Sequence, residues 1–596
     1  MSPKATAQVR RSQVITTWGP GAPIDLPRDA GIVGGLDTWP KTLDLDEVVD
    51  PRLTRKLGQL IGVPDARLFA PPADVASPGE RSLGIGVWRF PMWVLVQEER
   101  AGDGANRSRR LVHRRGLDGK GRFDGRPVVP TRFVRACPRG HIADVSWTRF
   151  VTHKDGETCR RQLWLDERGT GGDLGDLTVR CECGGSRPLR EAAEPGPLGP
   201  CYGDRPWLGA HASETCGLQS RLLIRTAANA YFPQVLSALS LTEAGSAVRT
   251  AVEQVWSMLQ AVEAPAELTV LRKIPDVATV LAGHSDQDVL EAVERIRSGG
   301  AGERPVKEVE LDALLAAPEG YGDDVPVDPN FHARGLPEAV WRRSDLAAGI
   351  ERVVQLHRLR EVLALVGFTR FEAVTPDING EYDTDVERAA LALDPSWYPA
   401  VENRGEGVFL ALNASAVDAW LGRDAVVERL GSLAEGHRRW AERRKLDRPF
   451  PGGPYVLLHT LSHLLMQALA LTCGYPASSI RERIYVDYAG KRYGLMLYTA
   501  SPDAEGTLGG LVAQTRHIDA HLRVALRAGA LCSNDPVCAQ HSPEEGMEGR
   551  WLHGAACHGC ALVAETSCEM RNDLLDRALV VPTLAVPDAA FFSAVA

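Results

Sequence analysis

The chain has 596 residues, of which 44% are hydrophobic and 24% are charged, and its formal net charge is −9. This composition is typical of folded proteins and excludes a disordered chain, and the length favours about three to five domains. The negative charge excludes a uniformly basic nucleic-acid coat but permits local basic patches.

The amino terminus, MSPKATAQVRRSQ, has basic residues but no apolar segment after them. We therefore expect neither a secretory signal nor a membrane anchor, and we expect a cytoplasmic protein. In a reducing cytoplasm, clustered cysteines indicate metal binding more often than disulfides.

Residues 1–130 are predicted to be an amino-terminal region that docks on a partner. Alternation in GIGVWRFPMWVLVQEE predicts strands, and the basic segment AGDGANRSRRLVHRRGLDGKGRFDGRP is expected to be a mobile loop because Gly and Pro bound it. Its arginines are candidates for contacts with DNA phosphates, with a merely solvated charged loop as the alternative. The candidates are Arg107, Arg109, Arg110, Arg114 and Arg115, followed by Lys120 and Arg122.

Residues 131–220 are predicted to form a zinc-ribbon-like module. The tight C-x-C of RCECGG and two later thiols suit one structural Zn²⁺ site, with buried metal-free thiols as the alternative. A second group upstream has the ligand types of a Cys₂His₂ site, although hydrogen-bonded structural histidines are equally consistent with it. The first group is Cys181, Cys183, Cys201 and Cys216, and the second is Cys137, His141, His153 and Cys159.

Residues 221–450 contain no cysteine and are predicted to form a mainly helical domain. Apolar residues recur at a spacing near 3.6 in three segments, and this spacing is typical of amphipathic helices. The segments are AGSAVRTAVEQVWSMLQAVE, LAAGIERVVQLHRLREVLALVG and ASAVDAWLGRDAVVERLGSLAEGHRRWAERRKL.

Residues 451–596 are predicted to form an α/β zinc-binding domain. A long helix in PYVLLHTLSHLLMQALALTCG precedes the strand-like sequences IYVDY and YGLMLYTA. The polar residues within the apolar window Tyr455–Tyr475 favour a buried helix of a soluble protein over a membrane span.

Five thiols follow this helix, for the four positions of a tetrahedral Zn²⁺ site. The C-x-x-C pair Cys557 and Cys560 is the firmest part, Cys538 and Cys568 flank it, and Cys532 competes with Cys538, so one thiol is expected to be spare. A closed four-thiolate site has no open position for water. We therefore expect it to support folding rather than hydrolysis.

His459 and His463 are four residues apart on the predicted helix and so lie on one face, as two metal ligands would. A metalloprotease needs a glutamate beside the first histidine, where this chain has Thr460, so packed and hydrogen-bonded histidines are the competing interpretation. No glycine-rich loop closes on Lys and Ser or Thr in the manner of a nucleotide-binding loop, which argues against ATP hydrolysis by this chain.

Several segments resemble the DrmB family of the bacterial DISARM anti-phage systems. They are RRSQVITTWGPGAPIDLP, IVGGLDTW, VQLHRLREVLALVGFTRFE, NRGEGVFL, CSNDPVC, GAACHGC, ETSCE and NDLLDRAL. The part from LLHTLSHLLM onward resembles the zinc-binding domain of mitomycin-repair-type DNA helicases. The resemblance implies a DrmA-like helicase partner that supplies ATP hydrolysis, contact of the complex with DNA, and carboxy-terminal metal ligands among the five thiols.

We therefore expect a multidomain α+β protein with small β-rich zinc modules, a mainly helical middle and an α/β zinc-binding carboxy-terminal domain. The leading hypothesis is a non-catalytic, Zn²⁺-binding helicase partner that helps to bind or recognise DNA and has no contact with a membrane. The alternatives are a metal-dependent hydrolase or nuclease using His459 and His463, and a pure protein scaffold without DNA contact.

Overall fold

A computed structural model describes residues 7–592, except residues 28, 64–65, 73–83, 98–99, 102–105, 155–158, 169–172, 242–245, 298–303, 321–327, 329, 383–386, 502–509 and 547–548. The chain divides into two compact units. Unit 1 comprises Met1–Ser237, Leu363–Thr375 and Tyr382–Glu402, and unit 2 comprises Ala238–Val362, Pro376–Glu381 and Asn403–Ala596. The predicted α+β class, with several sheets and zinc-binding modules, is confirmed.

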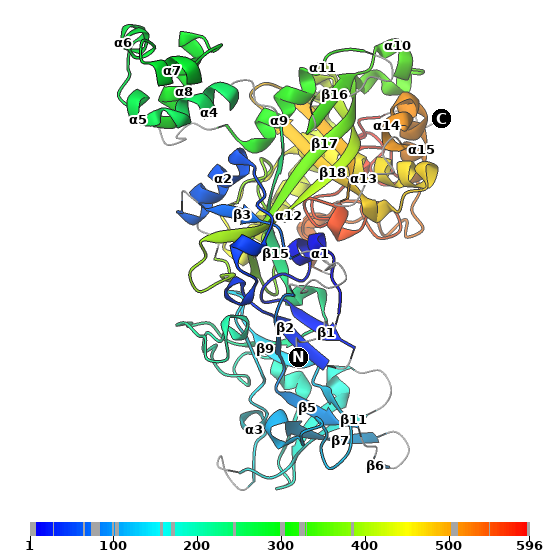
Figure 1. The fold of residues 1–596 in the computed structure, drawn as a ribbon. Coiled ribbons are helices and arrows are strands. Elements are labelled where there is room, and N and C mark those ends of the chain that lie inside the picture. Colours follow the sequence, from blue (N-terminus) through cyan, green and yellow to red (C-terminus); the bar gives the residue numbers. More distant parts are fainter. Residues whose placement is uncertain are drawn as a thin grey trace. The chain divides into compact units, whose positions relative to one another are not determined.

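Unit 1 is built mainly from short antiparallel strands (Figure 1). The largest of its sheets has the order β13-β12-β11-β7-β5-β8, with β6 beside β7, and smaller sheets have the orders β1-β2-β4 and β10-β9-β14. The strands are β1 (Pro23–Leu26), β2 (Asp29–Val33), β3 (Arg67–Phe69), β4 (Val87–Arg89), β5 (Trp93–Val96), β6 (Arg100–Ala101), β7 (Asn106–His113), β8 (Val128–Pro130), β9 (Phe133–Ala136), β10 (Ile142–Ala143), β11 (Leu163–Arg168), β12 (Leu177–Cys181), β13 (Ser186–Pro188) and β14 (Arg221–Ile224).

Alternation of side chains explains why one face of this large sheet is buried. On β12, Leu177, Val179 and Cys181 are buried while the residues between them are half-buried, as the two-residue repeat of a strand requires. The buried side chains pack on Trp147 and Phe150 of α3 (Trp147–Phe150). The remaining helices of unit 1 are α1 (Arg11–Thr16) and α2 (Pro51–Ile61).

Unit 2 contains most of the helices. Helices α4 to α8 have a small apolar core of their own, and the helices from α10 onward contribute to a larger one. The helices are α4 (Ser246–Gln254), α5 (Trp256–Leu259), α6 (Pro265–Leu271), α7 (Pro275–Val280), α8 (Asp286–Arg297), α9 (Val306–Leu315), α10 (Glu338–Trp341), α11 (Ala414–Leu421), α12 (Asp424–Arg444), α13 (Gly453–Cys473), α14 (Gly510–Gln514) and α15 (Ile518–Ala530).

A sheet of long strands has the order β15-β17-β18-β20-β19, with β16 on β17 and β3 on β18. The boundaries between the two units fall inside three of these strands, β15, β17 and β18. The strands are β15 (Phe232–Leu239), β16 (Phe331–Gly335), β17 (Ile350–Thr369), β18 (Trp397–Leu412), β19 (Ile480–Asp487) and β20 (Arg492–Ser501). The strands predicted in IYVDY and YGLMLYTA are confirmed as β19 and β20.

The prediction of a helix in LAAGIERVVQLHRLREVLALVG is wrong, because these residues form β17. Almost the whole strand is buried, and its neighbouring residues face different cores: Val353 lies in one apolar cluster, while Val354 and Leu356 lie in another. A strand that is covered on both faces is continuously apolar, so its pattern does not separate it from a buried helix. The other two predicted segments are helical, as α4 with α5 and α11 with α12.

Helix α13 runs through the core of unit 2 and packs against β19, β20 and α15 (Figure 1). It is apolar on all sides, and by length and composition it is long enough to cross a membrane, but 72% of its most apolar window is buried inside the fold. The prediction of a buried helix is therefore confirmed. Gly474 ends the helix in the left-handed conformation, with φ of 71°.

Candidate metal centres

Within the described residues, side chains suited to metal binding gather in four sets. In each set the ligand atoms lie within 4.8 Å of one another. Set 1 is Cys137, His141, Cys201 and Cys216, set 2 is His153, Cys159, Cys181 and Cys183, set 3 is Cys532, Cys538, Cys557 and Cys560, and set 4 is His459, His463, Glu482 and Cys568. Every cysteine of the chain except Cys473 belongs to one of them.

Set 1 is formed by a hairpin and a later loop of unit 1. Cys137 and His141 flank the turn between β9 and β10, and Cys137 Sγ lies 3.3 Å from His141 Nδ1. The other ring nitrogen, Nε2, is 2.7 Å from the Glu214 carboxylate, which Arg205 contacts in turn at 2.9 Å. A carboxylate on the far nitrogen fixes the tautomer of a metal-binding histidine, so this set has an outer shell as well as four donors.

The Cys201 sulfur of set 1 is an acceptor of hydrogen bonds. The neighbouring Cys137 thiol lowers the pKa of Cys201 to about 4, and the backbone N–H of Gly203 donates to the same sulfur at 3.4 Å. This lowering favours the thiolate form of Cys201, which is the form that binds a metal.

Set 2 joins the knuckle after β12 to a loop beside α3. Cys159 Sγ is 3.7 Å from Cys181 Sγ, and Cys183 Sγ is 3.5 Å from His153 Nδ1. The Nε2 atom of His153 is 2.7 Å from the backbone carbonyl of Thr148, so it carries the ring proton. The Nδ1 lone pair is consequently directed at the thiols.

Set 3 is the four-thiolate site expected near the carboxy terminus. Sγ separations are 3.8 Å for Cys538 and Cys560, 3.8 Å for Cys557 and Cys560, and 3.4 Å for Cys532 and Cys557. Backbone N–H groups donate to these sulfurs, as Asn534 does to Cys532 and Gly559 does to Cys557. All four positions are therefore taken by sulfur, and Cys532 and Cys538 are both in the set.

These distances fit zinc. Zn–S bonds of about 2.3 Å in a tetrahedron place two sulfurs about 3.8 Å apart, and a sulfur and a nitrogen about 3.6 Å apart. The measured separations in sets 1 to 3 run from 3.3 to 3.8 Å. A disulfide would need about 2.0 Å, and the cysteines are free.

Set 4 lies inside unit 2, with its residues at most 8% exposed. His459 and His463 come from α13, Glu482 from β19, and Cys568 directly follows the short 3-10 helix η13 (Glu565–Ser567). His459 Nε2 is 3.0 Å from Glu482 Oε1 and 3.1 Å from Cys568 Sγ, and His463 Nε2 is 3.4 Å from the same carboxylate oxygen. Cys568 is thus the thiol left over from set 3.

The structure divides the predicted ligands of unit 1 differently from the sequence analysis. Cys201 and Cys216 lie with the first pair of the chain, Cys137 and His141, and not with Cys181 and Cys183. Glu482 was missed, although a carboxylate between Ile480 and Ile484 on the buried face of a strand is a signal, since a buried charge needs a partner.

The basic segment is not a loop throughout, because its residues 106–113 form strand β7 and a 3-10 turn and further turns follow; residues 102–105 near its start lie outside the described residues. Arg107, Arg109 and Arg110 belong to β7, and Arg114 and Arg115 follow it in a 3-10 turn. Arg110 pairs with Asp124 at 2.8 Å, and Arg114 pairs with Asp29. These two arginines are therefore held within unit 1.

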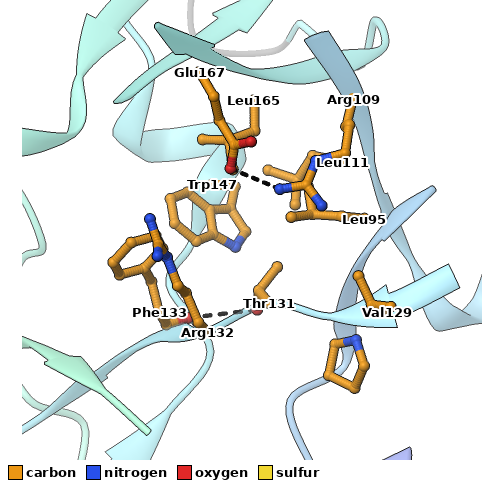
Figure 2. Close-up of a pocket in the computed structure, with 11 residues that line it drawn as sticks. Leu95, Arg109, Leu111, Val129, Thr131, Arg132, Phe133, Trp147, Leu165 and Glu167 are labelled. Atoms are coloured by element: carbon orange, nitrogen blue, oxygen red, sulfur yellow. Dashed lines mark hydrogen bonds and ion pairs between the residues drawn. The ribbon is translucent and has the colours of Figure 1, made fainter. Parts of the chain in front are cut away.

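Arg109 of β7 points toward Glu167 of β11 and pairs with it at 2.6 Å (Figure 2). Beside it is a cavity of about 210 Å³, lined by side chains that include Leu95, Leu111 and Trp147. Arg109 is only 22% exposed, and its ion pair with Glu167 links strands β7 and β11. The exposed basic side chains of this region are Arg107, Arg115, Lys120, Arg122 and Arg126.

The chain is similar to known proteins over most of its length. Residues 10–232, which include sets 1 and 2, match a family described as a domain of unknown function (DUF8724), and residues 461–561, which include set 3, match the MrfA Zn-binding domain. The chain is 32% identical over 487 residues to the DISARM protein DrmB of Bacillus paralicheniformis, across 78% of this chain and 83% of the relative. Zinc is thus the cofactor that both the donor sets and the domain match indicate. The chain belongs to the DrmB family of DISARM anti-phage defence proteins.

Proposed function

We propose that this protein is a non-catalytic, zinc-stabilised subunit that partners a DrmA-like helicase in the cytoplasm and helps it to bind DNA. The observation that carries the proposal is the similarity to a DISARM DrmB protein, together with a zinc-binding domain of the type named for MrfA. Mitomycin-repair-type helicases carry such a domain, so the resemblance implies a helicase as the partner.

The zinc sets support a binding role rather than a catalytic one. In sets 1 to 3 all four positions of each tetrahedron are filled by protein atoms, which leaves no place for a water nucleophile. Closed sites of this kind rigidify loops that bury little apolar surface. Rigid loops are suited to presenting side chains to a partner.

Set 3 presents apolar side chains of this kind. Leu531 and Val537, each directly before a ligand cysteine, are both 75% exposed. Exposed apolar groups on a rigid turn favour protein contact, because little conformational entropy is lost when they are buried. We propose that this turn contacts the helicase.

The proposed DNA contact uses the exposed basic side chains near β7. Arg115, Lys120 and Arg122 lie on the turn that follows the strand, and all three are exposed. Reversing Arg109 or Arg114 would break an internal ion pair and confuse loss of DNA contact with loss of fold. The informative variant therefore carries R115E, K120E and R122E.

The test measures binding of labelled single-stranded DNA to the complex of this chain and its helicase, across a series of salt concentrations. Each lost phosphate contact should flatten the slope of log affinity against log salt by about 0.7, so the triple variant should lose about 2 in slope. A control with K41E, K273E and K445E makes the same change in net charge at other exposed positions and should behave as wild type. Equal slopes for all three proteins would show a scaffold without DNA contact.

Docking is tested separately by co-purification. Leu531→Glu with Val537→Glu should reduce recovery of the tagged helicase about tenfold, while retaining the zinc of set 3. Val427→Glu, on the exposed face of α12 with 59% exposure, is the matched control. Undiminished recovery with the double variant would contradict docking through set 3.

A further inference from the structure

The four residues of set 4 are directed at a single point in the core of unit 2. His459 and His463 are 0% exposed, and Glu482 is 2% exposed. At this point, Glu482 Oε1 lies 3.0 Å from His459 Nε2 and 3.4 Å from His463 Nε2. Two tetrahedral ligands at about 2.1 Å from zinc would be about 3.4 Å apart.

Hydrogen bonds on the far side of each ring fix the tautomers. His459 Nδ1 is 3.3 Å from the carbonyl oxygen of Leu574, and His463 Nδ1 is 2.8 Å from that of Ala561. A carbonyl oxygen only accepts, so both Nδ1 atoms carry protons. In the neutral rings, both Nε2 lone pairs therefore face the carboxylate, and acceptors face acceptors.

The environment of His463 Nε2 gives the clearest indication that these facing acceptors share a ligand. This nitrogen is buried, and within the described part of the chain it makes no hydrogen bond, although Glu482 Oε1 is near. A buried polar atom without a partner is costly, and a cation at the common point would satisfy it.

The remaining donors are positioned as metal ligands are. Glu482 is oriented by the Ser462 hydroxyl and by the Glu569 backbone N–H at 3.1 Å, and Cys568 Sγ accepts the Asn572 backbone N–H at 3.1 Å. Such outer partners orient the first ligands of metal sites. A divalent ion with one carboxylate and one thiolate is also electrically neutral, as a fully buried site requires.

We propose that His459, His463, Glu482 and Cys568 bind a fourth zinc ion, separate from the four-thiolate ion of set 3. Imidazole and thiolate donors favour zinc over magnesium or calcium. The site is closed by four protein ligands and is buried, so it clamps α13, β19 and the segment after η13 together. A closed site does not hydrolyse a substrate. His459 and His463, on which the hydrolase alternative depends, are then structural ligands.

The experiment counts metals in the purified full-length protein by inductively coupled plasma mass spectrometry. We expect four zinc ions per chain, and three in His463→Asn and in Glu482→Gln. His521→Asn is the matched control, because His521 is a buried histidine of unit 2 outside all four sets, and this variant should retain four.

If the variants fail to fold, the wild-type protein still decides. Zinc-edge anomalous diffraction should place a peak between His459 Nε2, His463 Nε2, Glu482 and Cys568. A wild-type count of three with peaks at sets 1 to 3 alone would overturn the proposal, as would a fourth metal other than zinc.

Discussion

Arg429 Nε donates to Asp576 Oδ2 over 2.6 Å, and the two side chains are only 9% and 0% exposed. Asp576 also accepts the backbone N–H groups of Ala555 and Ala578, each at 3.0 Å. The pair therefore joins helix α12 to the segment that follows the third zinc set, and through Asp576 to Ala555, which lies between the ligands Cys538 and Cys557.

Arg429→Ala should destabilise unit 2 strongly, because it leaves Asp576 buried without a counter-charge. We expect a loss of about 3–5 kcal/mol in the free energy of unfolding, measured by denaturant titration. The exposed pair of Arg438 and Glu442 on the same helix provides the control, and Arg438→Ala should change the free energy of unfolding far less, because both charges remain in water. Similar losses in the two variants would contradict this account.

Removing two ligands of set 3 should prevent folding of the carboxy-terminal region, because zinc binding and folding are coupled. Cys557→Ser with Cys560→Ser is expected to give insoluble or proteolysed protein, measured as the soluble fraction after expression. Cys473→Ser changes the cysteine that lies outside every set and should remain soluble with its zinc intact. A soluble, well-folded double variant would mean that set 3 is dispensable for the fold.

The knuckle of set 2 depends on a close approach at Gly185. A Cβ atom there would lie 2.1 Å from the backbone oxygen of Thr152, so Gly185→Ala must displace the chain beside Cys183. We expect a cost of about 1–3 kcal/mol and weaker retention of zinc against a chelator. Gly119→Ala is the control, because a Cβ at Gly119 meets no atom within 4 Å. Equal zinc retention in the two variants would rule out this effect.

His437 should make unit 2 sensitive to mild acid. It lies between the rings of Trp440 and Phe450, and burial together with the charge of Arg448 lowers its pKa. As the pH falls below about 6.5, this histidine binds a proton in the unfolded chain but not in the folded chain. The free energy of unfolding therefore decreases by up to about 1.4 kcal/mol per pH unit.

The measurement is the thermal midpoint at about pH 7 and at about pH 5.5. His437→Gln should show a smaller decrease than wild type, whereas His211→Gln, at an exposed histidine, should match wild type. The interpretation fails if His437→Gln and wild type lose stability in parallel.

The local sequence pattern was sufficient to predict some elements of the fold. Helix α13 could be predicted because it is long, apolar and ended by Gly474, and β19 and β20 could be predicted because they are short runs rich in aliphatic and aromatic residues. Strand β17 could not, since both of its faces are buried and its apolar residues show no two-residue period. Burial from two sides is a property of the tertiary structure, which the local sequence does not contain.

The candidate sites show the same difference between features set by local sequence and features set by tertiary packing. The C-x-x-C of Cys557 and Cys560 identified set 3 because its geometry is local. The assignment of Cys201 to Cys137 depends on which loops pack together, so spacing alone gave the wrong partners. The sequence predicts a phosphate contact for Arg109 because its ion-pair partner, Glu167, lies on another strand 58 residues away.

Sets 1 and 2 are nested in the sequence: the ligands of set 2, from His153 to Cys183, all lie between His141 and Cys201 of set 1. During synthesis the inner set is complete as soon as Cys183 leaves the ribosome, whereas the outer set must wait for Cys216. The inner site can therefore capture its ion first and shorten the chain that the outer site has to close. The order of the ligands along the chain thus allows the inner site to fill before the outer one.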